Sequence, residues 1–340
     1  QFYTIQVDMA EPYNVYGGLQ DNGTMRGSSR TRWQFGQDWT HIGGGDGAYV
    51  AIDGEGKHTY TGYQFGYYTR TDADGKRSEV RPRSPLSEPP LRYNWMTPVM
   101  TSAHNPQVVY FAANRLYRSF DKAKSFQPIS PEMTQTKERG NVPFGTITTL
   151  SESPRRFGQL AVGTDDGFVH VSRDGGLSWQ AADDGLPAGR WVSRVEWSAH
   201  VDGRLYAALS GYRQDDDRAY LYASEDFGKT WKAIAAGLPA EPINVVREDP
   251  VNAQLLYVGT DRGAYASLDR GASWISLDGG MPKVPVHDLV VHLRDRELVA
   301  GTHGRSAWVL DALPLQELSG AVRAKPVHLF HVDAVQADRQ

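Results

Sequence analysis

The chain consists mainly of short runs in which apolar and polar residues alternate, separated by clusters of Gly, Asp, Asn and Pro. Residues 145–150, 159–163 and 168–172 form three such runs, joined by the turn-like stretch 164–167, and Trp179 opens a fourth. Alternation over about four to eight residues is typical of strands that bury one face. Helical periodicity is confined to a short piece at 314–318. The pattern predicts an all-β protein.

One eight-residue string recurs, with Ser, Asp, Gly and Trp at fixed spacing. Its complete copies are Ser172, Asp174, Gly176 and Trp179; Ser224, Asp226, Gly228 and Trp231; and Ser267, Asp269, Gly271 and Trp274. A degenerate copy starts at Ser119, with Ala123 and Phe126 replacing Gly and Trp. The copies lie 53, 52 and 43 residues apart. A period of about 40 to 50 residues with short strands is typical of β-propeller blades.

The repeat divides the whole chain into seven units of similar size. We expect one seven-bladed β-propeller over residues 1–340, built from four-stranded antiparallel blades with the repeated string as a hairpin. The blades are expected to begin near residues 2, 46, 95, 145, 192, 243 and 286, and a strand at 327–332 to finish the last. Because each blade buries its faces only against its neighbours, the seven form a single domain.

The repeated string reads as a fold marker. Its Asp accepts hydrogen bonds from amides of its own hairpin, and its Gly supplies a backbone angle closed to other residues. Its Trp offers a large surface to bury between neighbouring blades. Because turn chemistry and an aromatic anchor explain every position, we interpret the string as structural and look for function elsewhere.

Composition narrows the classes of function. The 36 basic and 40 acidic residues nearly cancel and form no long run of one sign, which argues against nucleic-acid binding driven by charge. No apolar stretch reaches the roughly 18 residues of a membrane span. Without cysteine, thiol catalysis and thiolate metal sites are excluded. The ten histidines show no metal-site spacing, so neither a metal nor another cofactor is expected.

The repeated strings resemble the Asp-box, or BNR repeat, of sialidases, xyloglucanase-like glycosidases, sortilin-type receptors and a photosystem assembly factor. Residues 16–24 (YGGLQDNGT), 41–53 (HIGGGDGAYVAID) and 298–311 (LVAGTHGRSAWVLD) are similar to bacterial sortilin-type proteins often labelled glycosyl hydrolases. The resemblance implies an exported protein, periplasmic or extracellular, in which an upstream propeller precedes this one. The cysteine-rich module of animal sortilins is absent from this chain.

A binding site is expected on the face opposite the repeated hairpins, around the mouth of the central channel. The loops joining second to third strands, and those between blades, should meet there. The candidate ligand-binding residues are His41, Asp46, Phe65, Arg115, Asp165, Asp166, Tyr212, Arg213, Asp261, Arg262, His303 and Arg305. Arginine supplies forked donors, and the aromatic rings would stack on sugar or peptide. The alternative is that the acidic residues cap turns and the other charges solvate a rim.

The first functional hypothesis is a recognition propeller that binds a glycan or an extended peptide at this mouth. The second is half of a two-propeller glycoside hydrolase. Residues 18–23 (GLQDNG) match the turn that holds a catalytic Asp in the second propeller of xyloglucanase-like enzymes, so the resemblance implies Asp21 as the general acid. Its partner carboxyl would lie about 5 to 9.5 Å away on the other propeller. The third hypothesis is an assembly factor that docks a protein partner.

Overall fold

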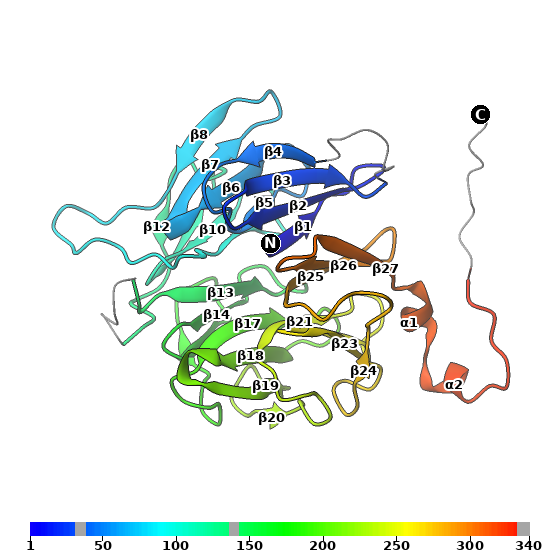
Figure 1. The fold of residues 1–340 in the computed structure, drawn as a ribbon. Coiled ribbons are helices and arrows are strands. Elements are labelled where there is room, and N and C mark those ends of the chain that lie inside the picture. The colour runs from blue at the N-terminus through cyan, green and yellow to red at the C-terminus, as the bar shows by residue number, and fades with distance from the viewer. Residues whose placement is uncertain (31–38, 136–142, 332–340) are drawn as a thin grey trace, which may run out of the picture.

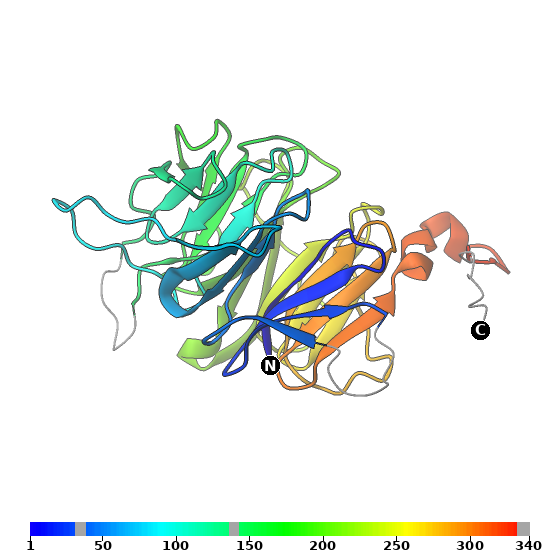
Figure 2. The same cartoon turned by 90° about the horizontal axis from the view of Figure 1, so that it is seen from above.

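Seven antiparallel sheets are arranged in a ring around a central channel in the computed structural model (Figures 1 and 2). The structure describes residues 1–30, 39–135 and 143–331. Six sheets have four strands and the seventh has three, and within every sheet the strands follow one another in sequence order. This arrangement is the seven-bladed β-propeller that the repeat predicted.

The strand bounds define the blades, numbered here in chain order. Blade 1 contains β1 (Phe2–Val7), β2 (Asn14–Leu19), β3 (Gly23–Ser28) and β4 (Trp39–Gly43), and blade 2 contains β5 (Val50–Ile52), β6 (Thr59–Tyr63), β7 (Tyr67–Thr71) and β8 (Arg77–Val80). Blade 3 contains β9 (Val99–Thr101), β10 (Val109–Ala112), β11 (Leu116–Ser119) and β12 (Gln127–Pro128), and blade 4 contains β13 (Ile147–Glu152), β14 (Leu160–Thr164), β15 (Val169–Ser172) and β16 (Gln180–Ala181).

The second half of the ring follows the same plan. Blade 5 contains β17 (Trp191–Trp197), β18 (Leu205–Gly211), β19 (Asp216–Ser224) and β20 (Lys232–Ala233), and blade 6 contains β21 (Ile243–Glu248), β22 (Leu256–Thr260), β23 (Gly263–Ser267) and β24 (Ile275–Ser276). Blade 7 contains β25 (Val286–His292), β26 (Glu297–Thr302) and β27 (Ala307–Asp311). Two 3₁₀ turns (Gln64–Gly66, Tyr212–Gln214) and two short helices, α1 (Leu313–Glu317) and α2 (Gly320–Arg323), complete the elements.

The core lies between blades. One cluster combines Ala161, Val169 and Val171 of blade 4 with Val195 and Leu209 of blade 5, all buried. The turns between third and fourth strands lie on one face, which we call the hairpin face. The turns between second and third strands lie on the opposite face, which we call the turn face, because successive turns of a meander alternate between the two ends of its sheet.

Each complete repeat forms the turn between the third and fourth strands of its blade. In the first copy Asp174 accepts hydrogen bonds from Ser178, at 2.9 Å from its N and 2.5 Å from its Oγ. Ser172 donates to Asp174 at 2.9 Å and accepts from the N–H of Gly176 at 2.8 Å. The copies that start at Ser224 and Ser267 repeat this set of bonds. The hairpin therefore satisfies its own polar groups.

The Gly and Trp of each repeat contact the preceding blade. Gly176 has a φ of 92°, and a Cβ added there would lie 2.6 Å from the carbonyl oxygen of Ile129, the residue after β12. The indole Nε1 of Trp179 donates to this same oxygen at 2.7 Å. Trp231 and Trp274 donate to the equivalent carbonyls, those of Ala182 at 2.8 Å and Ile234 at 2.9 Å. The string thus joins consecutive blades.

The last blade differs from the expectation of a fourth strand at 327–332. Residues 327–331 have irregular backbone, Val332 lies outside the described residues, and α1 and α2 follow β27 instead. Helix α1 packs against blades 6 and 7, because Leu313 is buried, Gln316 donates to Asp249 at 2.9 Å and Arg296 donates to Gln316 at 2.6 Å. The 314–318 pattern therefore indicated a real helix, and the strand was not formed because the chain turns away after β27.

Because the Trp of each repeat contacts the preceding blade, we predict that replacing it lowers the stability of the protein. Trp231→Ala should lower the free energy of unfolding by about 3 kcal/mol, because a large ring is lost from the interface between blades. Trp231→Phe should cost less, since it mainly removes a hydrogen bond worth about 1 kcal/mol. Urea unfolding followed by circular dichroism measures both. Trp308→Ala is the control, because the Trp308 indole donates to the carbonyl of nearby Arg305 in its own blade. Equal losses for both tryptophans would contradict the contact's role.

Candidate functional site

Five rings from four neighbouring blades meet on the turn face, at the mouth of the channel. We call Tyr3, Phe65, Trp95, His287 and His303 the aromatic strip. Phe65 follows β6 of blade 2, Trp95 precedes β9 of blade 3, and His303 follows β26 of blade 7. Phe65 and His303 were candidates from the sequence. Tyr3, Trp95 and His287 were missed because they lie in or beside the inner strands, where loop chemistry gives no signal.

A repeated bulge places Tyr3 and His287. In blades 1, 4, 5, 6 and 7 the pairing between first and second strands slips by one residue at the same point, between Phe2 and Thr4 in blade 1 and between Val286 and Asp288 in blade 7. Such a bulge leaves one residue unpaired and changes the direction of its side chain. The bulged residues are Tyr3 and His287 in these two blades.

The strip is held by contacts between rings. His287 and His303 are stacked with centroids 4.8 Å apart and planes at 24°. Tyr3 stacks on both histidines, at 6.3 Å from His287 and 5.9 Å from His303. Phe65 meets Trp95 edge to face at 5.2 Å, and the side chain of Trp95 lies near the Tyr3 hydroxyl. Trp95 remains 37% exposed, so the strip presents ring surface to solvent.

Asp21 and Asp46 lie beside this strip. Asp46 joins blades 1 and 2, because its Oδ1 accepts from the N–H of Asp21 at 2.8 Å and its Oδ2 from Gln64 Nε2 at 2.6 Å. Asp21 has a left-handed backbone with φ of 61°, is exposed, and its carboxylate makes no hydrogen bond with any described residue. The cap of this turn is therefore Asp46, which leaves the Asp21 carboxylate open to a ligand.

The environment of the strip keeps its titratable groups neutral. Burial, together with the carboxylates of Asp46 and Asp21, raises the pKa of Tyr3. Burial and the neighbouring His303 lower the pKa of His287 to about 4, and burial lowers that of His303. At neutral pH the strip is therefore a row of uncharged rings with a carboxylate at its side, a surface that can stack on flat apolar faces and accept hydrogen bonds.

Other candidate residues from the sequence are occupied by contacts within the protein. Asp165 is buried and accepts hydrogen bonds from the N–H groups of Gly145 and Thr146 at 3.0 and 2.9 Å, and burial raises its pKa. The remaining contacts are those of Asp166 with Thr164 and Gln135, Arg115 with Glu88, Arg213 over the ring of Trp191, and Asp261 with Asn244. These turn-face residues stabilise loops and the ends of blades.

Four candidates remain outside the strip with exposed side chains. His41 lies in β4 at the rim of blade 1, and Tyr212 projects from blade 5 with 65% of its surface exposed. Arg262 and Arg305 lie in the turns of blades 6 and 7, and neither guanidinium makes an ion pair with any described residue. The structure does not gather these four into one group, and they surround the mouth at different blades.

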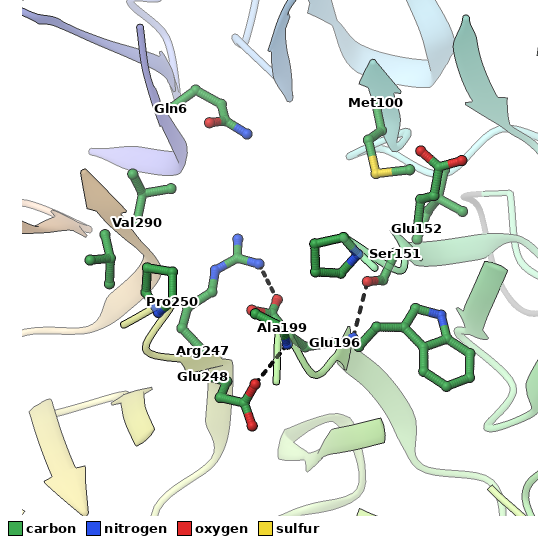
Figure 3. A pocket seen from close by; sticks show the side chains of 14 residues that line it. Gln6, Met100, Ser151, Glu152, Glu196, Ala199, Arg247, Glu248, Pro250 and Val290 are labelled. Carbon is green, nitrogen blue, oxygen red and sulfur yellow. Dashed lines mark hydrogen bonds and ion pairs between the residues drawn. The ribbon is translucent and has the colours of Figure 1, made fainter. Parts of the chain in front are cut away.

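The channel is hollow at the hairpin face. A cavity of about 330 Å³ lies among the ends of inner strands, with Glu152, Glu196, Arg247 and Glu248 among its lining residues (Figure 3). Met100, Pro250 and Val290 supply apolar wall. The sequence predicted a site only at the opposite mouth. Charged residues within otherwise apolar inner strands, such as Arg247 after Val245 and Val246, were the signal that could have indicated this chamber.

A buried carboxylate organises the channel above this cavity. Asp288 Oδ1 accepts from Arg194 Nη2 at 2.8 Å and Arg247 Nη2 at 3.0 Å, and its Oδ2 accepts from the N–H of Ile5 at 3.1 Å. Asp288 is 2% exposed and Arg194 6%. Arg247 also pairs with Glu196. These residues belong to blades 7, 5, 6 and 1, so a single side chain connects four blades.

Among the described residues, no group of three His, Cys, Asp or Glu side chains is arranged to hold a metal ion. Neither described helix is long and apolar enough to cross a membrane.

Comparison with known proteins identifies one protein of similar sequence and several structures of the same fold. No family model matches the chain. It is 33% identical to the vacuolar protein sorting/targeting protein 10 of Laccaria bicolor over 129 residues, 35% of this chain and 8% of that protein. The GH74 xyloglucanase of Xanthomonas campestris superposes with a TM-score of 0.68 at 17% identity, over 91% of this chain and 51% of the enzyme.

Two more solved structures have the same fold. The GH74 enzyme of Niastella koreensis gives a TM-score of 0.65 at 15% identity, over 91% of this chain and 52% of the enzyme. YCF48 bound to a D1 peptide gives 0.60 at 14% identity, over 91% of this chain and 93% of that one. The chain therefore spans about half the length of the xyloglucanases and nearly all of YCF48. At these identities the likeness shows the fold alone.

The Asp288 network predicts a strong dependence of stability on one charge. Asp288→Asn should lower the free energy of unfolding by about 3 to 5 kcal/mol, because it removes one partner of a buried ion pair and leaves Arg194 without a counter-charge. Chemical unfolding at neutral pH measures the loss. The exposed Asp217→Asn should change stability by no more than about 0.5 kcal/mol. A loss below about 1 kcal/mol for Asp288→Asn would contradict the network's role.

Proposed function

We propose that the chain is a recognition propeller that binds an extended ligand, a glycan or a stretch of peptide, across the mouth on its turn face. The observation that supports this proposal is the aromatic strip. Five rings from four blades lie together at the channel mouth, partly exposed and uncharged at neutral pH, with the open carboxylate of Asp21 beside them.

The chemistry of the strip suits both ligand classes. Flat ring faces pack against the apolar faces of sugars and against peptide side chains. Sugar hydroxyls and peptide N–H groups are donors that a carboxylate accepts. An extended ligand that crosses the strip would reach the rim, where Tyr212, Arg262 and Arg305 offer a further ring and two forked donors. These rim residues would favour ligands with carboxylate or carbonyl groups.

The comparisons support a binding role of this kind. YCF48, nearly all of which this chain covers, has been solved with a peptide bound. A sorting protein is similar over part of the chain. The strings that resemble Asp-boxes also support an exported protein with an upstream propeller. Binding of a peptide from a protein partner would make the chain a docking module.

From the aromatic strip we predict that ligand binding depends on the ring of Trp95. Trp95→Ala should weaken binding about tenfold or more, because burying an aromatic ring contributes about 1.5 to 3 kcal/mol. Ligands would come from a glycan array that includes xyloglucan oligosaccharides and from an array of extended peptides, and affinity from titration calorimetry. Phe157→Ala removes an exposed ring on the hairpin face and should leave affinity unchanged. Equal affinities for both variants would contradict the proposed site.

A second candidate function is hydrolysis of a polysaccharide together with another propeller. The open carboxylate of Asp21 favours it, and the chain covers only about half of each xyloglucanase, which leaves room for a facing domain. Glycoside hydrolysis needs two carboxyl groups about 5 to 9.5 Å apart, one of which protonates the leaving group. Asp46 is not that partner, since both its oxygens are bonded within the chain.

Asp21→Asn tests this second candidate in the full-length protein. If Asp21 is the acid, release of reducing sugar from xyloglucan should fall by at least about a hundredfold while binding is retained, because general acid catalysis contributes about 10²–10⁴ in rate. Asp74→Asn, an exposed acidic residue in the turn between β7 and β8, should leave the rate unchanged. Hydrolysis by Asp21→Asn at the wild-type rate would exclude Asp21 as the acid.

A further inference from the structure

A second group of stacked side chains lies on blade 2, outside the aromatic strip. Tyr63 ends β6 and Tyr67 begins β7, and these cross-strand partners stack with ring centroids 5.2 Å apart and planes at 6°. The register between β7 and β8 pairs Tyr68 with Val80, so Arg81 comes beside Tyr67 at the same end of the sheet. Side chains on one face of neighbouring strands lie close enough to interact. This end of blade 2 therefore carries two rings and a guanidinium side by side.

Tyr93 completes the group from the loop that follows β8. The guanidinium carbon of Arg81 lies 4.0 Å from the centroid of the Tyr67 ring and 4.3 Å from that of the Tyr93 ring. The cation is therefore held between two aromatic faces. The Tyr93 hydroxyl donates to the carbonyl of Pro82, which fixes the loop beside Arg81. We call Tyr63, Tyr67, Arg81 and Tyr93 the tyrosine–arginine row.

The row has polar groups that no described residue uses. Tyr63 and Tyr67 are 42% and 47% exposed, and neither hydroxyl makes a hydrogen bond with a described residue. Arg81 donates from Nη2 to the carbonyl of Phe65 at 2.9 Å, and its Nε has no acceptor among the described residues. Arg83, two residues further, is exposed and forms no ion pair with a described residue. Guanidinium N–H and phenol O–H groups are donors, so together they favour an anionic ligand group.

Two hollows flank the row and have an excess of positive charge. One, of about 270 Å³, is lined by the two exposed tyrosines, Arg81, Arg83 and Glu79. The other, of about 600 Å³, is lined by both arginines, Glu88 and apolar residues of the loop 82–91. Glu88 is already paired with Arg115 at 3.1 Å. Two arginines therefore face one unpaired carboxylate, that of Glu79, and the local field attracts anions.

We propose that the tyrosine–arginine row is a subsite for the carboxylate groups of an acidic glycan, a chain of uronic acid residues that extends outward from the aromatic strip. This inference rests on the proposed function and names the class of glycan. The row and the strip are continuous, because Arg81 bonds to the carbonyl of Phe65 and the N–H of Phe65 donates to the carbonyl of Trp95 at 3.3 Å. Arg83 can donate two parallel hydrogen bonds to a carboxylate.

A glycan suits this surface better than a peptide. Extended peptides are often recognised through main-chain hydrogen bonds to a sheet edge. At the row the main chain is already engaged within the protein, since Tyr63 pairs with Tyr67 and Phe65 uses both its N–H and its carbonyl. The groups that remain are side-chain hydroxyls and guanidinium groups. These match the hydroxyl and carboxylate groups of an acidic sugar.

Titration calorimetry on the full-length protein tests the proposal. The probes are hexasaccharides of galacturonate, glucuronate and mannuronate, each compared with the same sugar after methyl esterification of its carboxylates. The protein should bind at least one acidic hexasaccharide. Esterification should weaken that affinity about tenfold or more, because hydrogen bonds between charged groups are lost. Added salt should weaken binding of the acidic form and leave that of the ester unchanged.

Single substitutions assign this binding to the row. Arg83→Gln should weaken affinity for the acidic hexasaccharide about tenfold, and Tyr63→Phe, which removes only a hydroxyl, about fivefold. Arg77→Gln is the matched control and should leave affinity unchanged, because Arg77 is exposed at the opposite end of β8. Arg83 and the Tyr63 hydroxyl have no partner among the described residues, so all three variants should keep the wild-type melting temperature.

Comparison with Trp95→Ala separates the row from the strip. If Trp95→Ala weakens binding but esterification and Arg83→Gln do not, the strip binds a neutral glycan and the inference about the row is wrong. If Arg83→Gln weakens binding and Trp95→Ala does not, the row binds the acidic glycan and the proposed site at the strip is wrong. Hexaglutamate that binds as tightly as the acidic sugars, and less tightly to Arg83→Gln, would assign the row to acidic peptides. No binding of any acidic hexasaccharide at millimolar concentration would also overturn the inference.

Discussion

The ring depends on the buried carboxylate of Asp288. It accepts hydrogen bonds from Arg194 of blade 5, Arg247 of blade 6 and the N–H of Ile5 in blade 1, while it belongs to blade 7 itself. Each guanidinium is removed from water only because this acceptor and Glu196 neutralise it. Blades that otherwise contact only their neighbours are thereby connected across the channel, and the first and last blades are held in register.

The seam between blades 7 and 1 is closed by side chains, because within the described residues the two blades share no strand. Tyr13 donates to Glu297 at 2.5 Å and stacks on His292 at 4.1 Å, and His292 Nε2 lies 3.0 Å from the carbonyl oxygen of Asp8. At the turn face, Tyr3 meets His303 across the same seam. The proposed binding surface is therefore also a closing contact, so a ligand bound there would contact both ends of the ring.

The fold was predictable from the sequence because its marker is local. A hairpin in which Ser172 and Asp174 satisfy their own turn is encoded within eight residues, and its recurrence fixes the blades. The candidate site was predictable only in part. Loop positions in the sequence indicated Phe65, Asp46 and His303. A bulge that depends on pairing between strands places Tyr3 and His287 at the mouth, and no loop position indicates it. The irregular end of blade 7 depends on the packing of α1, which no local pattern expresses.

The proposed binding surface lies where equivalent positions differ between blades. The bulged position holds Thr148 and Ser193 in blades 4 and 5, and each hydroxyl donates to a carbonyl of the next blade, at 2.6 Å in both cases. In blades 1 and 7 the same position holds Tyr3 and His287, whose rings stack and remain partly exposed. A small hydroxyl residue would suffice to join blades there. The rings of Tyr3 and His287 are larger than a contact between blades requires. This difference distinguishes the turn face of blades 7 and 1 from that of blades 4 and 5.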